Sequence, residues 1–171
     1  MKKILMIIAK NEFRDEEYLV PKEYFEKAGI FVETASTGKG TCLGKLGASV
    51  EAQMSIDDVD TSDYDAVVFV GGYGSTVYFN NATAHRIAKD FYNSGKVTSA
   101  ICIAPMILVN SGILNGKKAT VYQSEAENMK NSGVNYTNAP VEVDGNIITA
   151  NGPDAAASFA ESIISVLKSK V

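Results

Sequence analysis

Histidine and cysteine are scarce in this sequence of 171 residues. There is one histidine, His85, and there are two cysteines, Cys42 and Cys102, which lie far apart in unlike surroundings. Their spacing matches neither a disulfide framework nor a set of zinc ligands, so we expect no metal site. His85 lies in a segment that we expect to be an exposed helix on the outside of the fold. This excludes a Cys–His catalytic pair within one chain unless a neighbouring subunit supplies the histidine.

Basic clusters and long apolar runs are also missing. The formal net charge is −4 and no block of basic residues occurs, which argues against a sequence-independent nucleic-acid binder. No span of about 18 apolar residues is present, so we expect no transmembrane helix. The first apolar run stops at Ala9, too early for a signal peptide, and Lys10 follows it. With so few cysteines, these features favour a cytoplasmic protein that binds neither nucleic acid nor membrane.

Segments typical of buried strands alternate with segments of helical spacing along the whole chain. We expect strands at 3–9, 30–36, 64–72, 94–102 and 117–122 and a hairpin with an Asp-Gly turn at 141–150. Helices are expected at 15–28, 82–92, 104–112, 124–133 and 154–170. This alternation predicts a parallel sheet with helices on both faces. We therefore expect one α/β domain over residues 1–171, a single-domain three-layer α/β/α sandwich with a mostly parallel central sheet.

Two stretches of this pattern are interpreted in more detail. In the first helix, helical spacing predicts a shared buried side for Tyr18, Leu19, Phe25 and Ala28. The charges at its start, Arg14, Asp15 and Glu16, are expected to face solvent. Residues 38–47 are glycine-rich and turn-prone, which predicts a flexible stretch with Cys42 as an incidental thiol, followed by a hairpin arm at 48–56.

Ligands of parallel α/β sheets bind at the carboxyl ends of the strands. That rule singles out three places in the sequence: the residues after Ala9, the segment GGYGS at 71–75, and Cys102 after Ile101. GGYGS lacks the lysine and the spacing of a phosphate-binding P-loop and the full Gly-x-Gly-x-x-Gly pattern. We therefore interpret its glycines either as a simple turn or as a close backbone approach with amide N–H groups aimed at an oxyanion.

Five motifs in the chain together resemble the ThiJ/PfpI superfamily. They are EEYLVP at 16–21, VVFVGGYGS at 67–75, AICIAP at 100–105, LNGKKATVY at 114–122 and VDGNIITANGP at 143–153, and their order and spacing are more specific than any one of them. This group includes the parkinsonism-associated protein and the intracellular-protease PfpI-like family. The resemblance implies a flavodoxin-like sandwich related to class I glutamine amidotransferases, a strand-to-helix nucleophile elbow, and a homodimer.

The resemblance implies that Cys102 is the elbow cysteine and that the carboxyl group of Glu17 hydrogen-bonds its sulfur. A helix that begins near Ala104 would present free N–H groups and the positive end of its dipole to the sulfur, which predicts a lowered thiol pKa and a reactive thiolate. The alternative is a buried, inert cysteine, because cysteine is one of the most commonly buried residues. Glu17 is expected to be buried and protonated, so that it donates to sulfur, whereas the alternative is an ordinary solvated carboxylate.

The remaining site residues are also implied by the resemblance. Gly71 and Gly72 resemble the glycine pair beside an oxyanion pocket, with the backbone amide of Ile103 as a second donor. Tyr122 occupies a position where relatives carry tyrosine or histidine, and we expect it at the rim of the site. In the protease-like branch a histidine follows the cysteine directly. Ile103 takes that place here, which argues against peptidase activity.

Three functions follow from one reactive thiol. The first is a cofactor-independent stress-response enzyme of the glyoxalase or deglycase type, which uses a Cys–Glu pair on small reactive carbonyls such as methylglyoxal. The second is an oxidation sensor, or a chaperone-like redox protein, whose cysteine becomes a sulfinate. The third and weakest is an intracellular cysteine peptidase. The expected partners are a small carbonyl substrate or an oxidant and a second copy of the chain.

Overall fold

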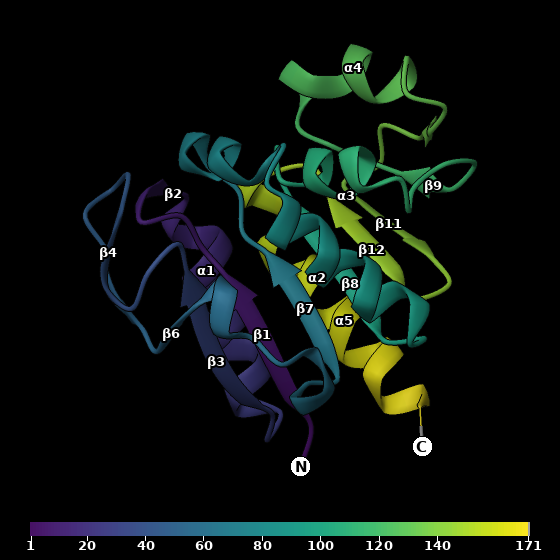
Figure 1. Cartoon of the computed structure of the whole chain (residues 1–171). Coiled ribbons are helices and arrows are strands. Elements are labelled where there is room, and N and C mark those ends of the chain that lie inside the picture. Colours follow the sequence, from purple (N-terminus) through teal and green to yellow (C-terminus); the bar gives the residue numbers. More distant parts are fainter. Residues whose placement is uncertain (171) are drawn as a thin grey trace.

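A computed structural model describes residues 1–170 and contains a twisted seven-stranded sheet (Figure 1). Its order is β11-β12-β8-β7-β1-β3-β6, and every neighbouring pair is parallel except β11 with β12, which form the predicted hairpin. The strands are β1 Lys3–Ile7, β3 Phe31–Ser36, β6 Met54–Ser55, β7 Ala66–Phe69, β8 Val97–Ile101, β11 Val141–Asp144 and β12 Ile147–Ala150.

Helices cover both faces of this sheet, so the predicted three-layer sandwich is confirmed. On one face α1 (Asp15–Lys27) packs beside α5 (Ala156–Ser169), and on the other face lie α2 (Ala82–Asn93) and α3 (Pro105–Ser111). The residues of β1 alternate between the two cores: Ile4 and Met6 belong to the α1/α5 side, and Leu5 and Ile7 to the α2/α3 side. A strand that is buried on both faces has no polar face, which explains its continuous apolar run.

Two small sheets lie beside the main sheet. The strands β2 (Asn11–Phe13), β4 (Gly40–Gly44) and β5 (Ser49–Ala52) form one of them, in which β4 and β5 make a hairpin. The second joins β9 (Lys118–Ala119) to β10 (Asn135–Tyr136), next to α4 (Ala126–Lys130). Short 3₁₀ helices fill several connections: 56–58, 61–63, 73–78, 123–125 and 153–155.

The structure corrects several local predictions. The strand expected at 117–122 is reduced to β9, outside the main sheet, and Thr120 N–H donates to Thr149 Oγ1 at 3.0 Å instead of joining a ladder. Cys42 lies in β4 with 1% of its surface exposed, so it is not in a flexible stretch. Leu19 is 47% exposed and Ala28 is also exposed. The apolar part of the buried face of α1 runs through Tyr18, Pro21 and Phe25, at the i, i+3, i+7 spacing of a helix stripe.

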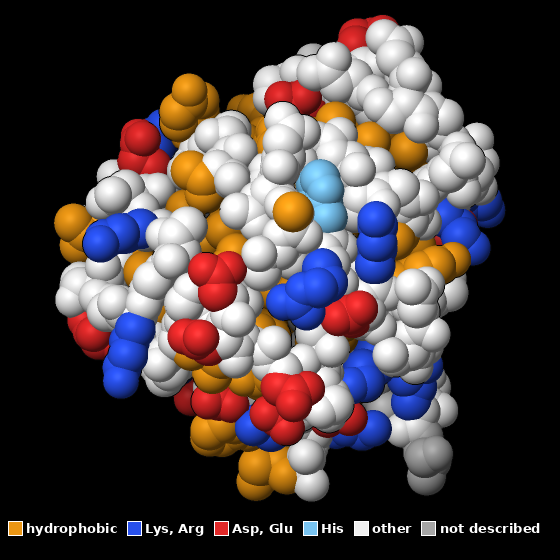
Figure 2. All heavy atoms as spheres, in the orientation of Figure 1, with side chains coloured by type: hydrophobic (Ala, Val, Ile, Leu, Met, Phe, Trp, Pro, Cys, Tyr) orange, Lys and Arg blue, Asp and Glu red, His pale blue; other side chains and the backbone are white. Residues whose placement is uncertain are grey.

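Lysine and arginine side chains are interspersed with acidic ones over the face in Figure 2, with no extended basic patch on that face. Among residues 1–170, no helix is both long and apolar enough to cross a membrane.

Candidate functional site

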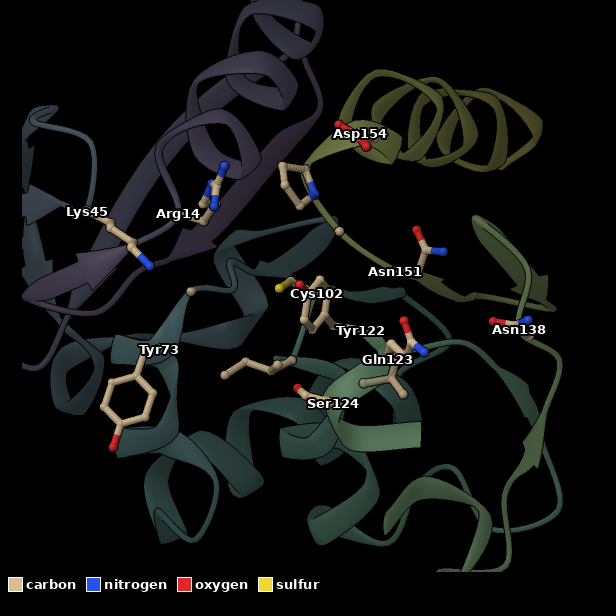
Figure 3. Close-up of a pocket in the computed structure, with 15 residues that line it drawn as sticks. Arg14, Lys45, Tyr73, Cys102, Tyr122, Gln123, Ser124, Asn138, Asn151 and Asp154 are labelled. Carbon is tan, nitrogen blue, oxygen red and sulfur yellow. The ribbon is translucent and has the colours of Figure 1, made fainter. Parts of the chain in front are cut away.

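Adjacent strands bring the three predicted segments together. Because β8, β7 and β1 are neighbours in the sheet, Cys102, the GGYGS loop and the residues after β1 all lie at one edge. A cavity of about 670 Å³ opens there (Figure 3). It is lined by Arg14, Lys45, Gly72, Tyr73, Cys102, Ile103, Val121, Tyr122, Gln123, Ser124, Asn138, Asn151, Gly152, Pro153 and Asp154.

Cys102 stands on the predicted elbow between β8 and α3. Its φ of +66° is in the left-handed region, which non-glycine residues rarely adopt and which active sites often retain under strain. The surrounding backbone holds it there, because Cys102 N–H donates to Ala150 O at 2.9 Å and Cys102 O accepts from Tyr122 N–H at 2.8 Å. The side chain is 8% exposed and reaches the cavity. The sulfur is therefore neither sealed in the core nor freely solvated.

Glu17 is fully buried in the first turn of α1, where the alternative of a solvated carboxylate is wrong. Both of its carboxyl oxygens lack a conventional hydrogen-bond partner within residues 1–170. The start of the helix is tied to the glycine loop, since Arg14 N–H donates to Gly71 O at 3.0 Å. Pro21, four residues on, has no N–H to donate to the Glu17 carbonyl, so the helix ladder is interrupted beside the site.

Gly71 separates Glu17 from Cys102. A Cβ at this position would lie 2.5 Å from Cys102 Cβ, 2.5 Å from Glu17 Oε1 and 2.6 Å from Ile101 O. Any larger residue would therefore push the acid and the thiol apart. Gly72 adopts a φ of +95°, and a Cβ there would lie 2.5 Å from Arg14 N. The glycine pair is thus a close backbone approach rather than a simple turn, while its role toward an oxyanion stays a prediction.

Burial raises the pKa of Glu17 to about 8, against weaker opposing effects from the Cys102 thiol, the Arg14 charge and the Gly71 amide. A carboxyl group taken out of water is disfavoured as an anion. At neutral pH Glu17 is therefore mostly protonated and able to donate a hydrogen bond, in agreement with the expectation.

The thiol of Cys102 departs from the prediction of a lowered pKa. The pKa of Cys102 is raised to about 12, mainly by burial and secondly by the charge of Glu17. The backbone amides of Gly72 and Ile103 lower it. The amides thus act in the predicted direction, but desolvation outweighs them. With Glu17 protonated its charge no longer acts on the thiol, and the first proton lost belongs to the pair rather than to either group.

Three other residues from the predicted segments have defined positions. Tyr122 is 46% exposed and its ring lies on Gly152, which places it at the rim as expected. Ser75 is buried, and its hydroxyl donates to Gly72 O at 2.8 Å, so it does not face the cavity. His85 is half-buried rather than exposed, and its Nε2 lies 2.7 Å from Phe79 O. It is not part of the cavity lining.

Sequence reasoning missed two parts of the site. Asp15, expected to be a surface charge, is 6% exposed and accepts hydrogen bonds from Leu46 N–H and Ala48 N–H, both at 2.8 Å. Residues 151–154 line the cavity because β12 is the other neighbour of β8. The rule for strand ends applies equally to β12, so the segment NGP at 151–153 was a usable signal. Within residues 1–170, no three His, Cys, Asp or Glu side chains are grouped to hold a metal ion.

Comparison with known proteins identifies the family of the chain. The family model described as "DJ-1/PfpI family" matches residues 2–166. The chain is 34% identical to deglycase PH1704 of Pyrococcus horikoshii over 97% of this chain and 99% of that protein. It is 33% identical to the putative cysteine protease YraA of Bacillus subtilis over 98% of this chain and 100% of that protein. A crystal structure of a ThiJ/PfpI domain protein from Brachyspira murdochii superposes with a TM-score of 0.97 at 34% identity, covering 99% of this chain and 98% of that one. The resemblance inferred from the five motifs is thereby confirmed, and the chain belongs to the DJ-1/PfpI family.

Proposed function

We propose that this protein is a cofactor-independent enzyme of the glyoxalase or deglycase type that acts on small reactive carbonyls through Cys102 and Glu17. The observation that carries the proposal is the thiol on a left-handed elbow at a cavity, facing a buried carboxyl group across Gly71. The names of deglycase relatives favour the same class. In this proposal Tyr122 borders the substrate at the rim, and the protein works as a homodimer in the cytoplasm.

The first step is addition of the sulfur to the aldehyde carbon of methylglyoxal. After the pair has lost one proton, the sulfur forms a bond to C1 and Glu17 gives its proton to the aldehyde oxygen, which yields a hemithioacetal. The backbone amides of Gly72 and Ile103, which already act on the thiol, stabilise the oxygen as its negative charge develops. An adduct of methylglyoxal on a protein amine offers an equivalent carbon.

The second step is an internal oxidation and reduction. The Glu17 carboxylate removes the proton on C1 and returns it to C2, and the hydroxyl proton passes from the C1 oxygen to the C2 oxygen. C1 is thereby oxidised to a thioester while the C2 ketone is reduced to an alcohol. Water then breaks the S–C bond, releasing lactate and the thiolate. The sum is methylglyoxal plus water to lactate plus a proton, and no external oxidant is consumed.

Lactate formation from methylglyoxal by the pure protein tests this proposal. Replacement Cys102→Ser should lower the rate at least about a hundredfold, because the serine hydroxyl is a far weaker nucleophile. The matched control is Cys42→Ser, which changes the other thiol, one that does not line the cavity, and should leave the rate within about twofold of wild type. Equal lactate production by Cys102→Ser and the wild type would contradict the mechanism.

A second candidate function is oxidation sensing, or a chaperone-like role switched by oxidation. It is favoured by the two carboxyl oxygens of Glu17, which are buried without hydrogen-bond partners in the described chain. Peroxide would convert the thiol to a sulfinate, with two peroxide molecules reduced to water, and the protonated carboxyl group would donate to a sulfinate oxygen. Peptidase activity ranks last, although YraA is named a putative cysteine protease, because Ile103 follows the cysteine and no histidine lines the cavity of the described chain.

A further inference from the structure

The cavity beside Cys102 has an asymmetric distribution of charge. Its basic lining side chains, Arg14 and Lys45, lie together on one side, from the start of α1 and the turn between β4 and β5 (Figure 3). Asp154, the acidic lining residue, lies on the other side, in the 3₁₀ helix at 153–155 that precedes α5. At about 670 Å³, the cavity is in the range that holds drug-sized ligands and far exceeds what a three-carbon aldehyde fills.

Lys45 is held at the cavity by a buried carboxylate. Asp15, one residue after Arg14, accepts hydrogen bonds from the backbone N–H groups of Leu46 and Ala48, both at 2.8 Å. Lys45 N–H donates to Phe13 O at 3.0 Å. The hairpin turn that carries Lys45 is thus anchored to the segment that carries Arg14. Among residues 1–170, Lys45 has no ion-pair partner.

The Arg14 side chain uses only some of its hydrogen-bond donors within the protein. Its Nε and Nη2 groups donate to the two carboxylate oxygens of Glu16 at 2.9 and 3.0 Å, which leaves three of the five guanidinium N–H groups for another acceptor. The hydrogen bond with Glu16 raises the pKa of Arg14, and the smaller effect of burial opposes it. Arg14 therefore carries a full positive charge within electrostatic range of the sulfur.

We propose that this cavity selects carbonyl compounds that also carry an anionic group, a carboxylate or a phosphate, which Arg14 and Lys45 bind while the carbonyl meets Cys102. This proposal rests on the proposed function, because it names the substrate class of the same site. Guanidinium groups bind oxyanions by geometry, and an ammonium group adds charge, so the two side chains complement each other. Glu17 does not oppose the anion at neutral pH, since burial keeps it largely protonated.

Alkylation of Cys102 with iodoacetate and iodoacetamide isolates this charge effect without requiring turnover. The two reagents form the same S–C bond and release iodide, but only iodoacetate is negatively charged. Peptide mapping measures the alkylation rate of Cys102 with each reagent. We expect the ratio of the iodoacetate rate to the iodoacetamide rate at Cys102 to exceed the same ratio for N-acetylcysteine. Arg14→Gln and Lys45→Gln should each lower the ratio by roughly two- to fivefold, which corresponds to the interaction energy of a solvent-accessible charge pair.

Two further variants complete the test: one should change the rate ratio in the opposite direction, and the other is a control. Glu16→Gln removes the competing carboxylate from Arg14, so it should raise the ratio, whereas a general loss of structure would expose the thiol and bring the ratio down to that of N-acetylcysteine. Lys39→Gln removes an exposed lysine that does not line the cavity and should leave the ratio unchanged. A wild-type ratio no higher than that of N-acetylcysteine, or a fall in Glu16→Gln, would overturn the proposal.

Two final experiments identify the anionic group that binds and test whether such compounds are turned over. Stronger protection of Cys102 from iodoacetate by inorganic phosphate assigns the subsite to phosphate, and stronger protection by acetate assigns it to carboxylate. Protection by neither overturns the proposal. In turnover, 4,5-dioxopentanoate should be converted to 2-hydroxyglutarate with a higher kcat/KM than 2-oxopentanal to 2-hydroxypentanoate. A raised alkylation ratio without turnover of either compound would refute the glyoxalase function while leaving anion binding intact.

Discussion

Cys42 and Cys102 are both buried, with 1% and 8% of their surfaces exposed, yet their surroundings give them different chemistry. Cys42 lies in regular strand β4, packed in the same apolar cluster as Phe13 and Tyr18, and its Sγ donates to Gly40 O at 3.8 Å. Cys102 has a left-handed backbone, a cavity beside it and a buried acid across Gly71.

The difference shows that burial alone does not determine the reactivity of a thiol. Burial raises the pKa of Cys102, which by itself would make it inert. What distinguishes Cys102 is the set of groups that act specifically on its sulfur: the amides of Gly72 and Ile103 and a carboxyl group that holds a proton at neutral pH.

The largest expected effect is that of Glu17→Gln on the pH dependence of stability. The pKa of Glu17 is about 8 in the folded protein and close to its ordinary value of 4.5 when unfolded, so the folded state holds more protons between these pH values. Raising the pH through this window therefore destabilises the wild type, by on the order of 3–5 kcal/mol in total, and the glutamine variant should lose that slope. Urea unfolding from pH 4.5 to pH 8.5 measures it.

Glu16→Gln is the matched control for that measurement. Arg14 lowers the pKa of Glu16, so this carboxylate stabilises the fold above its unfolded pKa and loses that contribution as the pH falls. The Glu16 side chain is 38% exposed, and its effect should be small and opposite in sign. A Glu17→Gln variant with the wild-type pH slope would mean that the carboxyl group is ionised in the fold.

The next effect concerns the contact between the acid and the thiol. Gly71→Ala places a methyl group 2.5–2.6 Å from Cys102, Glu17 and the Ile101 carbonyl, and the backbone carbonyl has no freedom to move away. We expect destabilisation of roughly 2–3 kcal/mol, the usual cost of overpacking, together with loss of lactate formation.

Gly38→Ala serves as the control for this steric argument. Gly38 has no atom within 4 Å of an added Cβ and no left-handed φ, so its replacement should change stability by less than about 1 kcal/mol. Thermal unfolding of both variants compares them directly. Equal melting temperatures for Gly71→Ala and Gly38→Ala would contradict the close approach.

Much of this site could be predicted from the sequence because its signals are local. The alternation of strands and helices fixes the sheet, and the rule for strand ends brings Cys102, Gly71 and the start of α1 to one edge. A cysteine between a buried strand and a helix also predicts the elbow, which Cys102 forms at φ +66°.

The parts that could not be predicted depend on contacts between distant segments. Asp15 reads as a solvated charge in the run RDEEY, and only the fold brings the turn at 44–48 onto its carboxylate. Cys42 reads as a loop thiol because glycines surround it, yet pairing of β4 with β2 and β5 buries it. The pKa of Cys102 was predicted in the wrong direction, because the sequence reveals the helix start but not the extent of desolvation.

The smallest expected effect is the selectivity of oxidation between the two thiols, which also tests the second candidate function. Cys102 borders the cavity, whereas Cys42 is 1% exposed and does not line it. After mild peroxide, peptide mapping should show two added oxygens on Cys102 at least about tenfold more often than on Cys42, because peroxide must reach the sulfur to oxidise it. Glu17→Gln should reduce the yield of the sulfinate relative to further oxidised products, since the amide replaces the protonated carboxyl group as donor. Preferential oxidation of Cys42 would instead show that β4 opens more readily than the cavity admits peroxide, and it would remove the basis for a sulfinate switch at Cys102.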